Sequence, residues 1–306
     1  MTLIHLIHMG GEGALNYSPT FSTDVPNSTG TAVPQTLTPL HACDSHIHIV
    51  DARFASNMPT MAGATVADYR QLQRRLGTSR AIVVQPKNYG TDNSCTLDAI
   101  AQLGIESARG IGVVYPDVTD AELQRLDRGG IRGLRFSLWN ASNNVTTIDM
   151  VLPLARRIDS LGWHVQLHMS GDQLVENAKL LESIPCSIVI DHMGRMPLTF
   201  GINHPSFKII TGLIDRGRTW VKLSGAYLNT EAGPPDYADA TAIAKAFAVY
   251  APERMVWGSD WPHVTEKEHK PDDALLFDLL AAWIPYESAR ARALVDNPAT
   301  LYGFTL

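Results

Sequence analysis

The feature that most constrains the fold of this chain is a regular alternation of short apolar runs with segments of helical period. Eight runs rich in β-branched residues recur, and amphipathic segments separate most of them. Runs that are apolar on both faces are typical of buried parallel strands. The runs cover residues 41–50, 80–85, 109–115, 131–138, 163–169, 186–193, 219–225 and 254–261.

Eight strand–helix units predict an α/β fold, specifically a (β/α)8 TIM barrel, which typically takes about 250 residues. A doubly wound open sheet is the competing fold, but no G-x-G-x-x-G motif follows the first run. We therefore expect a single barrel domain over residues 39–306, ending in a short helix at "DNPATLYGF". Residues 1–38 are rich in Ser, Thr, Pro, Gly and Asn and lack a period, which predicts an irregular N-terminal arm.

Composition narrows the class of protein. Of the 306 residues, 45% are hydrophobic and 18% are charged, and the formal net charge is -6. Without a basic cluster, nucleic acid is not an expected partner, and no apolar run reaches the roughly 18 residues of a membrane span. The first residues lack the cationic segment of a secretory signal. Three widely spaced cysteines indicate buried free thiols, so we expect a cytoplasmic protein and leave its oligomeric state open.

Histidine or aspartate recurs at the carboxyl ends of four of the expected strands, which form the mouth of a barrel. On the first strand, alternation places His46 and His48 on one face. With His168 on the fifth strand and Asp260 near the end of the eighth, they offer three imidazoles and a carboxylate, a set that suits Zn²⁺ or a similar divalent ion. His192, near the end of the sixth strand, is left over as a candidate acid or base.

The fourth strand bears on the number of metal ions and on the substrate. It presents Arg135, Ser137 and Trp139, whereas a two-metal site normally needs a bridging carboxylate or a modified lysine. We therefore expect a single ion. Arg135 interrupts a strand that is apolar on both sides, so a surface ion pair explains it poorly. Trp139 is a candidate for lining the pocket, with ordinary packing as the alternative.

At these residues the chain resembles the amidohydrolase superfamily, and more closely its branch of 2-pyrone-4,6-dicarboxylate lactonase, galactarolactone isomerase and related lactone hydrolases. The resemblance spans roughly residues 40–303 and is carried by "DSHIHIVD", "GIRGLRF", "IVIDHMGR" and "GSDWPH". It implies that Asp260 is the base that deprotonates the attacking water and that His192 polarises or orients the carbonyl. It also implies that Arg135 and Arg195 grip a substrate carboxylate, with a surface ion pair as the alternative for Arg195.

The chain departs from the dicarboxylate lactonase at two places. That enzyme has a tyrosine where this chain has His168 and works without metal, so the histidine favours one divalent ion, Zn or Mn, with a metal-free site as the alternative. The regions "SLWNASNNV" and "GAYLNTEAGPP" also lack the lactonase's additional arginines, which Lys87 and Tyr89 would replace in part. A site with fewer cations disfavours a dianion, so we expect a lactone with one carboxylate or more hydroxyls.

The resulting expectation is a hydrolase that opens the ester bond of a small carboxylated lactone in aromatic-acid or sugar-acid catabolism. Lactone isomerisation on the same site and metal-dependent decarboxylation are the alternatives. A non-catalytic sugar-acid binding protein is disfavoured because many polar groups converge on one rim. Tyr227 and His263 are further candidates for substrate contact, each of them open to a packing or exposed role instead.

Overall fold

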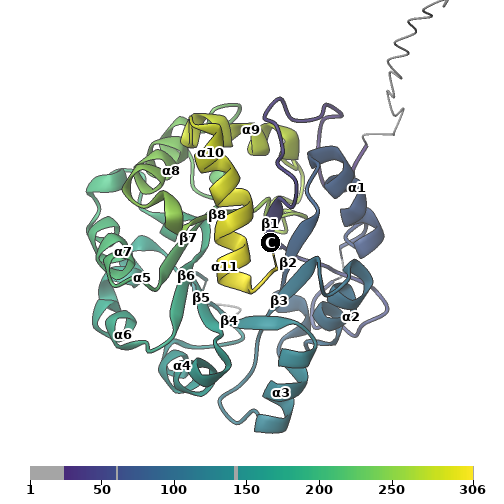
Figure 1. The fold of residues 1–306 in the computed structure, drawn as a ribbon, viewed down its shortest axis with the longest axis vertical. Helices are drawn as coiled ribbons and strands as arrows, with labels where there is room; N and C mark the ends of the chain where they lie inside the picture. The colour runs from purple at the N-terminus through teal and green to yellow at the C-terminus, as the bar shows by residue number, and fades with distance from the viewer. Residues whose placement is uncertain (1–23, 60, 141–143, 306) are drawn as a thin grey trace, which may run out of the picture.

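The computed structural model describes residues 24–59, 61–140 and 144–305 of the chain. It shows an eight-stranded parallel sheet in the order β1 to β8, curled into a barrel with helices around the outside (Figure 1). The α/β class and the (β/α)8 architecture expected from the sequence are confirmed. The strands are β1 (Cys43–Ile47), β2 (Arg80–Val84), β3 (Ala108–Gly112), β4 (Ile131–Ser137), β5 (His164–His168), β6 (Ser187–Ile190), β7 (Thr219–Leu223) and β8 (Met255–Trp257).

Helices follow each strand, and local signals in the sequence set several of their ends. Thr65 forms a capping box with Asp68 at the start of α1, and Gly77 ends that helix in the left-handed conformation. Ser170 and Gln173 form a second capping box at the start of α5. The helices are α1 (Val66–Leu76), α2 (Ser94–Leu103), α3 (Asp120–Arg128), α4 (Val151–Ile158), α5 (Gly171–Glu176), α6 (Ala178–Ser183), α7 (Pro205–Asp215), α8 (Ala238–Tyr250), α9 (Asp273–Trp283), α10 (Glu287–Ala291) and α11 (Asn297–Tyr302).

The barrel closes between β1 and the segment after β8, and this closure places the site. The Asp260 N–H donates to the His46 carbonyl at 2.9 Å, and the His48 N–H donates to the Trp261 carbonyl at 2.8 Å. Gly258 permits the approach, because a Cβ there would lie 2.8 Å from the His46 backbone nitrogen. Backbone hydrogen bonds therefore fix Asp260 beside the two histidines of β1.

The amino end of the barrel is apolar and covered. Cys43, Ile82 and Ile111 from three neighbouring strands pack with Tyr302 and Phe304 in one buried cluster. Figure 1 looks down the barrel with α11 lying across this end. The short helix expected at "DNPATLYGF" is thus present and covers the end of the barrel opposite the strands' carboxyl ends.

Residues 1–23 of the expected N-terminal arm lie outside the described residues, whereas residues 24–38 run without helix or strand. This segment is tied to the barrel. Arg75 of α1 is buried, donates to the Thr29 carbonyl and pairs with Asp272. The Trp261 indole N–H donates to the Pro26 carbonyl at 2.8 Å. The segment therefore packs behind the loop that carries Asp260.

Two expectations from composition can be compared with the structure. Cys43, Cys95 and Cys186 are buried free thiols, as expected. Within the described ranges, no helix is both long enough and apolar enough to cross a membrane.

Candidate active site at the carboxyl ends of the strands

The centre of the site is a group of imidazoles around one carboxylate. The Nε2 atoms of His46 and His48 lie 3.4 Å apart. Asp260 Oδ1 lies 3.5 Å from the first, 3.7 Å from the second and 3.9 Å from Nε2 of His192. The structure therefore brings together four residues that the sequence placed at the ends of β1, β6 and β8.

The backbone after β6 turns sharply to present His192. His192, Met193 and Arg195 all have positive φ, at 48°, 55° and 40°, which non-glycine residues rarely adopt. The His192 ring is held by Ser224, whose Oγ lies 2.9 Å from Nδ1. Gly225 leaves room for this ring, because a Cβ there would lie 2.9 Å from the same nitrogen. Packing thus maintains a conformation that the isolated segment would not favour.

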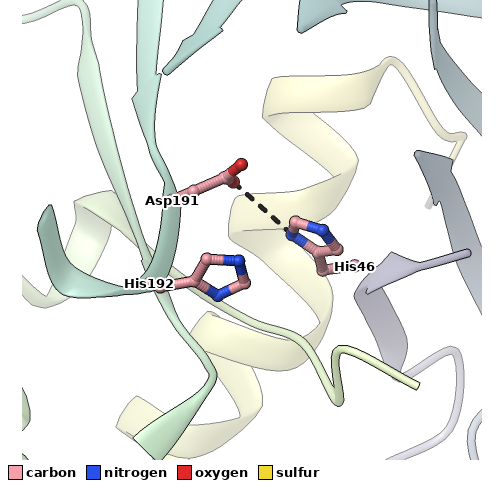
Figure 2. A group of neighbouring side chains, drawn as sticks. All are labelled: His46, Asp191 and His192. Carbon is pink, nitrogen blue, oxygen red and sulfur yellow. Dashed lines mark ion pairs between the residues drawn. The ribbon is translucent and has the colours of Figure 1, made fainter. Parts of the chain in front are cut away.

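Two trios of potential metal ligands share His46, with ligand atoms within 4.8 Å of one another. One is His46, His48 and Asp260; the other, drawn in Figure 2, is His46, Asp191 and His192. Four ligands at about 2.1 Å in a tetrahedron lie about 3.4 Å from one another. The first trio, at 3.4, 3.5 and 3.7 Å, matches this spacing.

The second trio fits a cation less well, because Asp191 already has partners. Gln166 Nε2 donates to Asp191 Oδ2 at 3.0 Å, Lys222 Nζ lies 3.5 Å from Oδ1, and Arg135 Nε lies 3.7 Å from Oδ2. Asp191 Oδ1 in turn lies 3.4 Å from Nδ1 of His46. Asp191 is therefore placed to orient His46, as carboxylates behind metal-binding histidines do.

His168 lies beside His192. In the part of the chain that the structure describes, it belongs to neither trio. Its Nδ1 lies 3.2 Å from Ser137 Oγ, and its ring centroid is 5.0 Å from that of His192. Its Nε2 is buried and has no hydrogen-bond partner among the described residues, which leaves this nitrogen available as a ligand.

Burial sets the protonation of the cluster. It lowers the pKa of His48 to about 3 and holds the pKa values of His46, His168 and His192 well below the usual range. Neutral imidazoles keep a lone pair for a metal ion or a proton. Burial also raises the pKa of Asp260 to about 6, opposed by the hydrogen bond from Tyr227. The carboxylate is thus more basic than an exposed one.

The charges beneath the cluster balance one another. Burial alone would raise the pKa of Asp191, but the Lys222 ammonium and the His46 ring hold it well below the usual range. Burial lowers the pKa of Lys222 to about 8, with Asp191 opposing the change. Lys222 is fully buried and donates to Gln166 Oε1 at 2.8 Å. An ionised pair therefore lies under the site at neutral pH.

A sequence profile described as amidohydrolase matches residues 43–304, the whole of the barrel. The chain belongs to the amidohydrolase family. It is 33% identical over 282 residues to a "2-pyrone-4,6-dicarbaxylate hydrolase" of Comamonas testosteroni, covering 88% of this chain and 92% of the relative. It is also 33% identical over 282 residues to a D-galactarolactone isomerase of Agrobacterium fabrum, covering 90% and 94%. Relatives of the lactone hydrolase and isomerase branch are thus confirmed.

Solved structures agree with the fold. A protein of Agrobacterium tumefaciens in its apo form superposes with a TM-score of 0.82 at 30% identity, covering 89% of this chain and 99% of that one. An amidohydrolase of Burkholderia multivorans with bound zinc has a TM-score of 0.64 at 17% identity, covering 86% and 99%. At that identity the second likeness shows the shared fold alone.

Two cations of this amidohydrolase face a pocket next to the cluster. Lys87 and Arg135 line a pocket that is open to solvent, together with Ser137, the partner of His168. Arg135 is buried, and its Nε has no hydrogen-bond partner among the described residues. Two of the side chains expected to meet an anionic substrate group, Arg135 and Lys87, thus line one pocket.

The remaining predicted residues fall into three places. Arg195 stacks on Trp139, with its Cζ 3.9 Å from the ring centroid, and the Trp139 ring lies nearly parallel to that of His168. Tyr227 and His263 lie behind Asp260. The Tyr89 hydroxyl donates to the Asp51 backbone carbonyl at 3.0 Å.

Sequence reasoning missed the residues that support the cluster from below and behind, namely Asp191, Gln166, Lys222, Ser224 and Asp273. One signal was available. Lys222 stands inside an apolar strand, and strand alternation places Gln166 on the face shared with His168. A charge within such a strand is rarely buried unless it has a partner.

Proposed function

We propose that this amidohydrolase opens the ester bond of a small carboxylated lactone, with Asp260 as the base that activates water. The observation that carries the proposal is the placement of this carboxylate. Tyr227 donates to its Oδ2 at 2.7 Å, while Oδ1 faces His46, His48 and His192 at the mouth of the barrel. Two relatives named as lactone-acting enzymes, at 33% identity, support the same substrate class.

The chain's own residues supply each proton movement. Asp260 accepts a proton from water, whose oxygen bonds to the lactone carbonyl carbon. The ring C–O bond then breaks, and Asp260 returns the proton to the leaving ring oxygen. When Ser224 donates to Nδ1 of His192, the neutral ring carries its proton on Nε2 and can donate it to the developing oxyanion.

We further propose that one divalent ion, Zn or Mn, is bound by His46, His48 and Asp260, with His168 as a further ligand. The tetrahedral spacing of the first three and the unpartnered Nε2 of His168 support this set. A bound ion would supply Lewis acidity toward the carbonyl. The Burkholderia multivorans amidohydrolase of the same fold, which was solved with bound zinc, supports the proposal of a metal.

The substrate is proposed to carry one carboxylate. Arg135 and Lys87 line the pocket beside the cluster, so a single anionic group can meet both cations there. Arg195 is stacked on Trp139 and donates to the Leu228 carbonyl, which places it at the rim. A dianion would leave one charge without a buried cation. A clear preference for 2-pyrone-4,6-dicarboxylate over a monocarboxylated lactone would refute this part.

Isomerisation is the second candidate, favoured by the relative named as an isomerase. There a substrate hydroxyl replaces water, and the same base serves both nucleophiles. Turnover in ¹⁸O-labelled water distinguishes the two. Hydrolysis places the label in the new carboxylate, isomerisation yields an unlabelled second lactone, and release of CO₂ would indicate decarboxylation instead.

The role of Asp260 is tested by Asp260→Asn, which keeps the shape of the side chain and removes its basicity. For any lactone that the enzyme turns over, we expect kcat to fall at least 1,000-fold, which is on the order of the contribution of a general base. Substrate binding measured by calorimetry should survive. Turnover within a few-fold of the unmodified enzyme would show that another group is the base.

A further inference from the structure

A row of four side chains runs from the start of α9 to the proposed base. Asp273 Oδ2 lies 3.1 Å from Nε2 of His263. Nδ1 of His263 lies 2.9 Å from the Tyr227 hydroxyl, which donates to Asp260 Oδ2 at 2.7 Å. Three separate segments, after β7, after β8 and at the first residue of α9, thus meet in one continuous chain of hydrogen bonds.

The chain is enclosed. His263 and Asp273 are fully buried, so solvent does not replace either partner. The Tyr227 and His263 rings pack edge to face at 5.1 Å between centroids. The backbone of His263 is fixed as well, since its N–H donates to the Asp260 carbonyl and its own carbonyl accepts from Lys270 Nζ at 2.8 Å. Both ring nitrogens of His263 are therefore occupied without substrate.

The directions of the hydrogen bonds follow from the acceptor at one end. An ionised Asp260 can only accept, so the Tyr227 hydroxyl donates its single proton to it. The Tyr227 oxygen must then accept from Nδ1–H of His263, so a second proton has to lie between Nε2 of the same ring and Asp273 Oδ2, which are 3.1 Å apart. Asp273 is at the N-terminus of α9, where a carboxylate is favoured. Each member thus fixes the orientation of the next.

We infer that Tyr227 and His263 are positioning residues that hold Asp260 with Oδ1 toward the imidazoles, rather than groups that bind substrate. The inference rests on the proposed function, because both residues act through Asp260 as the base. Without the Tyr227 hydroxyl, the Asp260 carboxylate can rotate about its side-chain bonds, and Oδ1 then no longer points toward the imidazoles. A misaligned base slows proton transfer without weakening the binding of the lactone.

The test compares Tyr227→Phe with Tyr250→Phe at equal metal content. Tyr250 is the matched control, because its hydroxyl also donates to a carboxylate, that of Asp215 at 2.9 Å, but on the surface of α8. We expect Tyr227→Phe to lower kcat roughly 10- to 100-fold, the effect of losing a hydrogen bond to a charged group, with KM within about threefold. A rise in KM with unchanged kcat would show a substrate contact and overturn the inference.

The order of the chain is tested by combining Tyr227→Phe with His263→Asn. If His263 acts only through the Tyr227 hydroxyl, adding His263→Asn to Tyr227→Phe lowers kcat by less than about twofold more, although His263→Asn alone lowers it severalfold. If the kcat losses of the two single variants instead multiply in the double variant and parallel the fall in its thermal midpoint, the role of the two residues is merely structural. Full activity of Asp260→Asn would sink the proposed function itself, whereas an inactive Asp260→Asn beside a fully active Tyr227→Phe sinks only this inference.

Discussion

Lys222 offers the sharpest test of how the site is supported. The replacement Lys222→Met keeps most of the side-chain volume and removes the ammonium that lies 3.5 Å from Asp191 Oδ1 and 3.4 Å from His46 Nδ1. Both Lys222 and Asp191 are fully buried, so without its nearest cation Asp191 must either remain as a poorly compensated buried charge or take up a proton, and both cost stability. Removing one partner of a buried pair destabilises a protein by about 3–5 kcal/mol.

That free energy converts into a measurable shift in the thermal midpoint. Unfolding entropies of about 2.1 cal/mol/K per residue give roughly 0.6 kcal/mol per degree for a chain of this length, so the midpoint should fall by about 5–8 °C. Thermal melts and urea unfolding followed by tryptophan fluorescence measure both quantities. Lys245→Met, on the exposed face of α8, is the matched control and should change stability by less than about 0.5 kcal/mol.

A double variant separates charge from packing. Lys222→Met with Asp191→Asn removes both charges, so it should be less destabilising than the sum of the two single changes by at least about 1 kcal/mol. Strict additivity, or a midpoint within about 2 °C of the unmodified protein for Lys222→Met, would show that the buried pair does not support the site as argued.

Two further predictions concern the metal and the substrate. Elemental analysis of the purified protein should find about one divalent ion per chain, and His48→Ala should lower this content. After the ion is removed with a chelator, added Zn or Mn should restore the activity. Activity that survives complete chelation would contradict a metal requirement. Arg135→Met should raise KM for a carboxylated lactone roughly 10-fold or more, the loss of a charge-assisted hydrogen bond, and leave KM for an uncharged lactone nearly unchanged; an equal rise for both would show general disruption of the pocket.

Most of the fold follows from local patterns in the sequence. The eight apolar runs became strands because a strand that is apolar on both faces is buried when the barrel interior covers one face and a layer of helices covers the other. Thr65 and Gly77 mark the two ends of α1 directly. Closure of the barrel has no such signal, because it depends on hydrogen bonds between His46 and Asp260, which are more than 200 positions apart.

The candidate site divides in the same way. The positions of the strand ends in the sequence predicted that His46, His48, His192 and Asp260 would meet, because parallel strands bring their carboxyl ends to one rim. The supporting residues could not be paired from sequence, because Lys222 lies on β7 and Asp191 directly follows β6, and the sequence does not state the register of these two strands. The role of His263 depended on the start of α9, ten positions on, where Asp273 occupies the second ring nitrogen.

The two ends of the barrel explain why this fold can support both hydrolases and isomerases. At the amino end, apolar side chains and Tyr302 of α11 form a closed core that contributes stability without touching the site. At the carboxyl end, the positive φ angles at His192 and Arg195 and the buried charges lower the free energy of unfolding. Lys222 and Asp191 lie between these regions, so substitutions there should change stability and activity together. Changes at Arg135 or Lys87, which face the pocket, should instead change the choice of substrate while leaving the barrel intact.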